Sequence, residues 1–497
     1  MVRNRRSHGL SVRYRGDVGA GTLEYTAVVV AVVMLVGTMA AIFPSVGSHV
    51  ACSLSNAFAT ITGGNTTSCG GSGGGQAGGD GKLTPRLSVS VPTGPTAGAG
   101  TVQVKVEVND GVTYTVTSDQ PWAVPYGDWG PGNGNASVLF QSNAGGPRQA
   151  TLTVTSSDGK TQTVTVTQPG QTQTYVAWGD SYSAGVGTNP GTMPGSSDYD
   201  TSERRSRWGP IPDAWNEDEC YRAVESWTRQ LGDGRQTSAA GTPSLNMSTD
   251  NFKACSGATW DGTKVTGGGH APSVKDQMDA TDPSAGVVTL TVGGNDIGFA
   301  DIVTNCVNPV SGGVAWDWNP WNAGTKTADQ YMAACGQGIA DGRQLVANDL
   351  GPRLTEVYQH ALDSAPNATI YVVGYPPVVE MDDVNHTWTP GHIPPANIPE
   401  AVQLLTDLND KIRETVDEVN ASSTSGPRLV YVDPTAPDSP FNGHSVGDSD
   451  PYINGIRLHS QLAINSSLAI PSYHPNKKGN DAYAQLVARY IMGDYSG

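Results

Sequence analysis

A serine hydroxyl follows directly on an apolar run in the segment TYVAWGDSYSAGVG, residues 174–187. The run 175–178 stops at Gly179-Asp180-Ser181, after which small residues predominate. A buried strand that ends in a tight turn is how an α/β scaffold presents a nucleophile at the carboxyl edge of its sheet. Ser181 is therefore a candidate nucleophile, and the alternative is an ordinary turn. Beside it, we expect Asp180 to brace the backbone.

Three further segments suit the same chemistry. Gly257 stands in a turn of small residues in FKACSGATW, and Asn295 follows an apolar run and a glycine pair in TLTVGGNDIGFAD. His474 precedes a helix-like stretch in PSYHPNKKGNDAYA. Each residue stands at the edge of an expected strand or helix, so we expect the segments to meet at one edge of a sheet.

Ester hydrolysis through an acyl-enzyme needs a hydroxyl, a base beside it, and donors aimed at the developing oxyanion. Ser181 supplies the hydroxyl and His474 the base. The backbone N–H groups of Ser181 and Gly257 and the side-chain amide of Asn295 supply the donors. Glycine suits position 257 because a bare backbone lets the substrate carbonyl come close. A single histidine among nine carries little weight, but the four residues in this order predict a serine esterase.

The elements that must position these residues are also readable. Continuous apolar runs, typical of parallel strands covered on both faces, alternate with helix-like stretches. The apolar runs are 286–292, 368–376 and 428–433, and the helix-like stretches are 338–364, 398–419 and 480–492. This alternation predicts an α/β fold, an α/β/α sandwich with its loops gathered at one edge.

The four segments together resemble the blocks of the GDSL/SGNH hydrolase family, which are centred on Ser, Gly, Asn and His. The resemblance extends over roughly residues 173–495, and we assign the hydrolase domain to 173–497. Within it, ACSGAT, GGNDIGF, FNGHSVGDSDPYING and SYHPNKKG are similar to secreted actinobacterial esterases and lipases. The resemblance implies a flavodoxin-like three-layer domain and hydrolysis with no metal and no organic cofactor. It also implies disulfides that join Cys220 to Cys255 and Cys306 to Cys335.

The chain departs from this family pattern in two places. The segment GHSVGDSD lacks a cysteine that many relatives carry, so the third disulfide of those relatives is missing. Pro471 stands three residues before His474, where family members often have Asp. Some relatives orient the imidazole with a backbone carbonyl instead, so we expect the carbonyl of Pro471 to do this. Asp448 or Asp450, reaching in from the preceding loop, is the alternative.

A tryptophan-rich insertion, AWDWNPWNAG, lies between Cys306 and Cys335. Trp316, Trp318 and Trp321 are candidates to line an acyl or glycan site or to form a lid. The alternative is that they form the core of their own loop.

The amino-terminal part, residues 1–50, has the pattern of a membrane segment. Five arginines precede TAVVVAVVMLVGTMAAIF (26–43), an uncharged stretch just long enough to span a bilayer. The basic flank predicts that the rest of the chain faces outward. The residues GAGTLEY before the stretch resemble the start of Flp-type pilins, which a peptidase cuts after a glycine, here Gly19. Pilin-like processing and simple anchoring are both open, as are secretion and attachment to the outer face of the membrane.

Residues 51–83 form a glycine-rich linker that cannot bury a core. Cys52 and Cys69 lie at its base, and neighbour-with-neighbour pairing predicts a disulfide between them. In all, six cysteines without a CxxC motif fit disulfides better than zinc.

Residues 84–170 alternate apolar and polar side chains in short runs broken by turn residues, which predicts an all-β sandwich. The position of Trp122 and the closing VTVTQPG resemble a BACON-type domain, an immunoglobulin-like module. The resemblance implies a carbohydrate partner, and Trp122, Tyr126 and Trp129 are candidates for a sugar platform. The alternatives are that the domain is a spacer and that Trp122 belongs to its core.

Composition limits the partners. The formal net charge of −17 and the pI near 4.8 argue against nucleic acid and against an anionic membrane surface. We therefore predict a surface-tethered or secreted serine ester hydrolase, a lipase or esterase, acting on an ester of a lipid or of an acetylated glycan. Two alternatives remain: a carbohydrate esterase that removes acetyl groups, and a surface-binding or pilus-associated protein with a vestigial hydrolase domain.

Overall fold

The computed structural model describes residues 86–127, 131–188, 220–235, 242–262, 272–306, 310–311, 314–315, 328–385, 393–455 and 472–494. They all belong to one compact unit, residues 84–497. The expected membrane segment, the linker and the Cys52–Cys69 pair lie outside the described residues. Across the described ranges, no helix is both long and apolar enough to cross a membrane.

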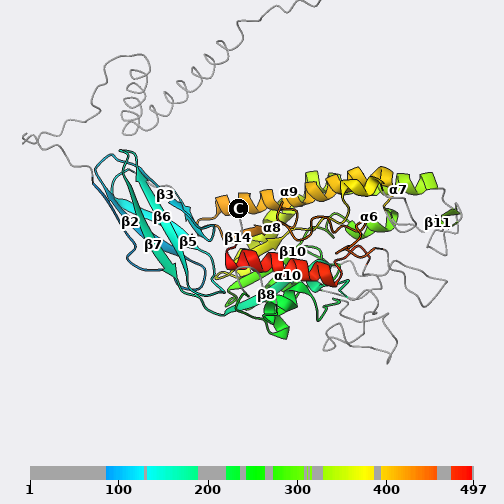
Figure 1. Ribbon diagram of the computed structural model, residues 1–497, viewed down its shortest axis with the longest axis horizontal. Coiled ribbons are helices and arrows are strands. Elements are labelled where there is room, and N and C mark those ends of the chain that lie inside the picture. Colours follow the sequence, from blue (N-terminus) through cyan, green and yellow to red (C-terminus); the bar gives the residue numbers. More distant parts are fainter. Residues whose placement is uncertain are drawn as a thin grey trace, which may run out of the picture. The chain divides into compact units, whose positions relative to one another are not determined.

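A five-stranded parallel sheet forms the centre of the carboxyl-terminal part of the described chain (Figure 1). Its order is β14-β13-β10-β8-β9, so the first strand in the chain lies between the second and the third, as in flavodoxin-like doubly wound folds. The strands are β8 (Gln173–Gly179), β9 (Leu245–Asn246), β10 (Val287–Thr291), β13 (Thr369–Val373) and β14 (Leu429–Val432). Three of them match the predicted apolar runs. Every residue of β10 and β13 is buried, which explains their continuous apolar sequence.

Helices cover both faces of this sheet, as the α/β/α prediction requires. α5, α8 and α9 pack together on one face, whereas α4 and α10 pack together on the other (Figure 1). Their bounds are α4 (Trp227–Gly232), α5 (Val274–Asp279), α8 (Gly351–Ser364), α9 (Ile398–Ser422) and α10 (Lys477–Met492). Short α3 (Ser181–Ala184) follows β8, and α6 (Phe299–Cys306) follows β10.

The predicted helix over 338–364 is interrupted. The structure has α7 (Ala328–Leu345), a π-helical stretch Val346–Leu350, and then α8. Pro352 stands in the first turn of α8 and has no N–H to donate to the carbonyl four residues earlier, so the regular helical pattern cannot run through this point.

Both disulfides that the resemblance implied are present. Cys220 is bonded to Cys255, and Cys306 is bonded to Cys335. The second bond joins the end of α6 to α7.

Two antiparallel sheets form the amino-terminal part of the described chain (Figure 1). One has the order β1-β2-β5-β4 and the other β3-β6-β7, and inward side chains from both share a single apolar core. The strands are β1 (Leu87–Ser90), β2 (Gly100–Val108), β3 (Tyr114–Ser118), β4 (Ala123–Tyr126), β5 (Gly134–Phe140), β6 (Arg148–Ser156) and β7 (Thr161–Gln168). Buried and exposed residues alternate along β2, as the period-two pattern predicted.

The loop between β5 and β6 contacts the amino-terminal ends of two strands of the parallel sheet. The Ser142 hydroxyl donates to the carbonyl of Gly286 at 2.6 Å, just before β10. The Ser142 N–H donates to Oγ1 of Thr369, the first residue of β13, at 2.9 Å. Ser142 is fully buried, so these hydrogen bonds are shielded from water.

Candidate active site

Ser181 is the first residue of α3, directly after the turn that ends β8. Gly179 in that turn has φ +133°, and a Cβ there would lie 2.5 Å from Oγ1 of Thr291 on β10. Only glycine fits this close approach between the two central strands. Asp180 caps α3 because its carboxylate accepts the N–H of Tyr182. The sequence thus places Ser181 at the carboxyl edge of the sheet, between its first and third strands.

His474 lies against Ser181 although 293 residues separate them. Its Nε2 is 2.7 Å from the Ser181 Oγ, and its Nδ1 is 2.9 Å from the carbonyl oxygen of Ser472. A carbonyl only accepts hydrogen bonds, so Nδ1 carries the proton and Nε2 is left as the acceptor that faces the serine. This tautomer is the one that can take a proton from Ser181.

The orienting carbonyl belongs to Ser472, one residue later than the sequence analysis suggested. Pro471 itself lies outside the described residues. Between Ser472 and His474, Tyr473 has φ +59°, in the left-handed region that side chains rarely adopt. Its carbonyl accepts the Tyr182 hydroxyl at 2.9 Å, and its N–H donates to the carbonyl of Asn454 at 3.0 Å. These contacts hold the tight turn that returns the Ser472 carbonyl to the imidazole.

The two aspartates considered as the carboxylate of a catalytic triad have other partners. Asp448 accepts the N–H of Ser445 at 2.6 Å, and Asp450 forms an ion pair with Lys478. Burial lowers the pKa of His474 to about 4, and the Ser472 carbonyl opposes this only in part. The imidazole is therefore neutral at neutral pH, as a base must be.

The segments of the predicted oxyanion hole lie beside the nucleophile. The N–H of Cys255 donates to the carbonyl of Gly179 at 2.9 Å, which brings the turn containing Gly257 to the end of β8. Gly257 has φ +78°, so this turn requires glycine. The Asn295 amide donates to the carbonyl of Ala258 at 3.0 Å and so joins the second segment to the third.

Asp180 stabilises the turn before the nucleophile through hydrogen bonds to neighbouring elements, as expected from its position. Beyond the cap on α3, its carboxylate accepts the hydroxyls of Thr291 at 2.7 Å and Tyr375 at 2.5 Å. Burial raises the pKa of Asp180 to about 6, and these hydrogen bonds oppose the shift. The carboxylate is therefore ionised at neutral pH.

A mainly apolar pocket opens at Ser181 and Asn295. Its walls come from α3, α6, α9 and the loops after β10 and β13. The other lining residues are Asp180, Tyr182, Gly294, Phe299, Tyr375, Val378, Leu405 and Leu408. Sequence reasoning missed the residues from 375 onward, because no local motif marks them.

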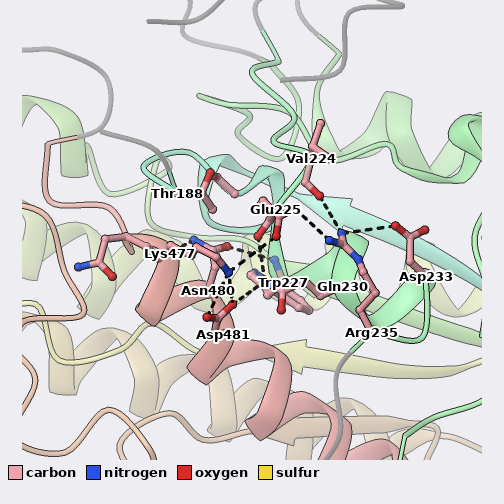
Figure 2. A network of polar contacts seen from close by, with 12 residues as sticks. Thr188, Val224, Glu225, Trp227, Gln230, Asp233, Arg235, Lys477, Asn480 and Asp481 are labelled. Atoms are coloured by element: carbon pink, nitrogen blue, oxygen red, sulfur yellow. Dashed lines mark hydrogen bonds and ion pairs between the residues drawn. The ribbon is translucent and has the colours of Figure 1, made fainter. Parts of the chain in front are cut away.

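A polar network between α4 and α10 supports both halves of the site (Figure 2). Asn480, fully buried, accepts the N–H of Trp227 at 3.1 Å and donates to the carbonyl of Pro475, next to His474. The indole N–H of Trp227 donates to the carbonyl of Tyr182, next to Ser181, at 2.9 Å. Asn480 thus contacts the segment that carries His474, and Trp227 contacts the segment that carries Ser181.

The sequence-predicted tryptophans lie outside the described residues or in the core of the sandwich. Trp316, Trp318, Trp321 and Trp129 lie outside the described residues. Trp122 is 3 % exposed, packs on Phe140 and lies under the guanidinium of Arg148, so it belongs to the sandwich core and cannot form a sugar platform. Among the described residues, no group of three or more His, Cys, Asp or Glu side chains is arranged to bind a metal ion.

Comparison with known proteins finds relatives of this chain among bacterial lipases. Lipase 1 of Streptomyces coelicolor is 30% identical over 320 residues, which is 64% of this chain and 86% of that lipase. A lipase of Streptomyces rimosus is 28% identical over 313 residues, which is 62% of this chain and 83% of the relative. The crystal structure of phospholipase A1 from Streptomyces albidoflavus NA297 is 23% identical and covers 64% of this chain and 98% of its own, with a TM-score of 0.43. No protein-family model matches the sequence.

Proposed function

The chain belongs to the GDSL/SGNH hydrolase family together with the Streptomyces lipases, and on this premise we propose that Ser181 and His474 form its catalytic dyad. The protein is a serine ester hydrolase, a carboxylic ester hydrolase. The observation that supports the dyad is the 2.7 Å hydrogen bond between Ser181 Oγ and His474 Nε2.

In the proposed reaction, Ser181 Oγ attacks the ester carbonyl carbon as its proton passes to Nε2 of His474. The negative charge on the carbonyl oxygen is held by the N–H groups of Ser181 and Gly257 and by the amide of Asn295. Collapse of the tetrahedral intermediate expels the alcohol, which takes the proton from His474 and leaves an acyl-enzyme. A water molecule then attacks the acyl-enzyme and gives a proton to His474, which passes it to Ser181 Oγ as the acid leaves.

The substrate class we propose is a lipid ester with an acyl chain longer than acetate. Phe299, Val378, Leu405 and Leu408 give the pocket apolar walls next to the serine. Burying a methylene against such walls contributes about 0.8 kcal/mol, so each added carbon that fits favours binding.

We also propose that the enzyme acts outside the cell. The disulfides Cys220–Cys255 and Cys306–Cys335 support this, because such bonds persist mainly in oxidising compartments. The apolar segment 26–43 would tether the chain to the membrane, and the linker 51–83 would give it reach. Residues 84–170 would then be an immunoglobulin-like, BACON-like domain that spaces or docks the hydrolase domain, 173–497.

The test is hydrolysis of nitrophenyl esters from acetate to palmitate by the full chain, with acetylated xylan beside them. We expect kcat/KM to rise from acetate to medium or long acyl chains, and Ser181→Ala to abolish turnover while folding is retained. Activity confined to acetyl groups and strongest on the glycan would make the enzyme a carbohydrate esterase instead. Full activity of Ser181→Ala would overturn the assignment of the nucleophile.

A further inference from the structure

Tyr375, two residues after β13, lies with its hydroxyl between two segments of the candidate active site. The side chain is buried, with 4 % of the residue exposed. Its Oη donates to the carboxylate of Asp180 at 2.5 Å and accepts the N–H of Gly294 at 3.0 Å. A single phenol oxygen therefore links positions that are 114 residues apart in sequence.

Both partners adjoin residues to which the proposed function gives oxyanion donors. Asp180 precedes Ser181, and Gly294 precedes Asn295. We propose that Tyr375 is a positioning residue that sets the spacing between the Ser181 N–H and the Asn295 amide, and so fixes the oxyanion hole. This inference rests on the proposed function, because it assigns Tyr375 a task in the same reaction.

The phenol is held so that it has little room to move. The side-chain amide of Asn409, on α9, accepts the N–H of Tyr375 at 2.9 Å and donates to its carbonyl at 2.8 Å. The ring meets that of Tyr182 edge-on, with centroids 5.1 Å apart at 84°. At Gly294, a Cβ would lie 3.1 Å from the phenol oxygen, so a bare backbone lets the hydroxyl approach this closely.

The charge of Asp180 strengthens the link to Gly294. An ionised acceptor makes the O–H of Tyr375 a charge-assisted donor, and a polarised hydroxyl is in turn a better acceptor for the N–H of Gly294. The three groups form one chain, from the N–H of Gly294 through the phenol to the carboxylate. Removal of the phenol oxygen breaks both links at once and leaves the N–H of Gly294 without this partner.

The experiment compares Tyr375→Phe with Tyr175→Phe in the full-length enzyme. Tyr175 is a matched control because it is also buried, on β8, and its hydroxyl bonds to Oγ1 of Thr289 at 2.8 Å. Tyr175 pairs with Val287, the first residue of β10, and so lies away from the donors at the carboxyl ends of the strands. Measured quantities are kcat, KM, the thermal midpoint, and the inhibition constant of an alkyl boronic acid, whose tetrahedral serine adduct places an oxygen in the oxyanion hole.

We expect Tyr375→Phe to lower kcat about ten- to hundredfold, less than the ~10²–10³ for complete removal of an oxyanion donor, with KM changed less than about twofold. The inhibition constant of the boronic acid should rise by a similar factor in Tyr375→Phe. In Tyr175→Phe, kcat and this inhibition constant should stay within about twofold of the values for the unmodified enzyme. An unchanged kcat in Tyr375→Phe would overturn the proposal. So would equal losses in both variants, or a loss confined to KM. The activity of Ser181→Ala tests the proposed function separately, since it does not depend on Tyr375.

Discussion

At the scale of single residues, the unusual feature is the group that orients His474. The carbonyl of Ser472 accepts a hydrogen bond from Nδ1 at 2.9 Å, at the place where a Ser-His-Asp triad has a carboxylate. A carbonyl selects the correct tautomer but stabilises the imidazolium less than a full negative charge does. The proposed dyad would therefore depend more on geometry than on charge.

Replacement of the nearby aspartates tests this view. Because Asp448 and Asp450 bond to Ser445 and Lys478 rather than to His474, Asp448→Asn and Asp450→Asn should each change kcat/KM by less than about threefold. The measurement is steady-state hydrolysis of the preferred nitrophenyl ester. A loss of about a thousandfold or more, approaching the ~10⁴ reported for loss of a triad aspartate, would reveal a carboxylate that acts on the base.

The pH dependence of activity should reflect the desolvated, half-buried imidazole of His474. Since the pKa of His474 is lowered to about 4, the main fall of kcat/KM at acidic pH should be centred near pH 4 rather than near 6.5. Protonation of Asp180 near pH 6 removes the charge that its hydroxyl donors face, so it should add a smaller, few-fold step above this main fall. A pH profile with its main acidic limb at about 6.5 would contradict the effect of burial.

Stability cannot substitute for activity in that experiment, because the two pKa shifts act in opposite directions. For His474, the unfolded chain binds more protons between pH 4 and 6.5, so its contribution to the free energy of unfolding falls as the pH is lowered. For Asp180, the folded chain binds more protons between pH 3.8 and 6, so its contribution rises over much of the same window. The two contributions largely offset each other between pH 4 and 6.

Among the helices, strands and turns, the features that depend on adjacent residues could be predicted from the sequence, and those that depend on distant residues could not. The strand that ends in Gly179, the glycine turn at 257 and the helix after His474 could be predicted, because each depends on residues adjacent in sequence. Tyr375, Asn454 and Asn480 could not be predicted, because their partners in the site lie far away along the chain. Asn454, for example, donates to the carbonyl of Gly187, 267 residues earlier.

The α4–α10 network offers a test at this scale, because it has a buried and a partly exposed end (Figure 2). Asn480→Ala leaves the buried N–H of Trp227 without its acceptor, so we expect a loss of about 1–3 kcal/mol in unfolding free energy and a lower kcat. Asp481→Ala, its sequence neighbour, removes only partly exposed contacts with Lys477 and Gln230 and should cost less than about 1 kcal/mol. Denaturant unfolding and kcat of both variants provide the comparison, and equal effects would contradict it.

In the molecule as a whole, the candidate active site lies at the carboxyl ends of the parallel strands, and the sandwich contacts their amino-terminal ends. Ser181 and Asn295 follow the carboxyl ends of β8 and β10. Ser142, from the sandwich, bonds at the amino-terminal ends of β10 and β13. The sandwich therefore contacts the catalytic part where it can stabilise the sheet without lining the pocket.

This arrangement predicts that stability and activity separate at Ser142. In Ser142→Ala the N–H of Ala99 loses its acceptor and the carbonyl of Gly286 loses a donor, so we expect the free energy of unfolding to fall by about 1–3 kcal/mol. The control Ser137→Ala, on β5, removes one exposed hydrogen bond with Gln103. It should change the free energy of unfolding by less than about 0.5 kcal/mol. Because the substrate pocket lies at the opposite edge, kcat/KM should stay within about twofold in both variants. A specific fall in kcat/KM of Ser142→Ala, measured well below its unfolding transition, would instead show that the sandwich acts on the active site through the sheet.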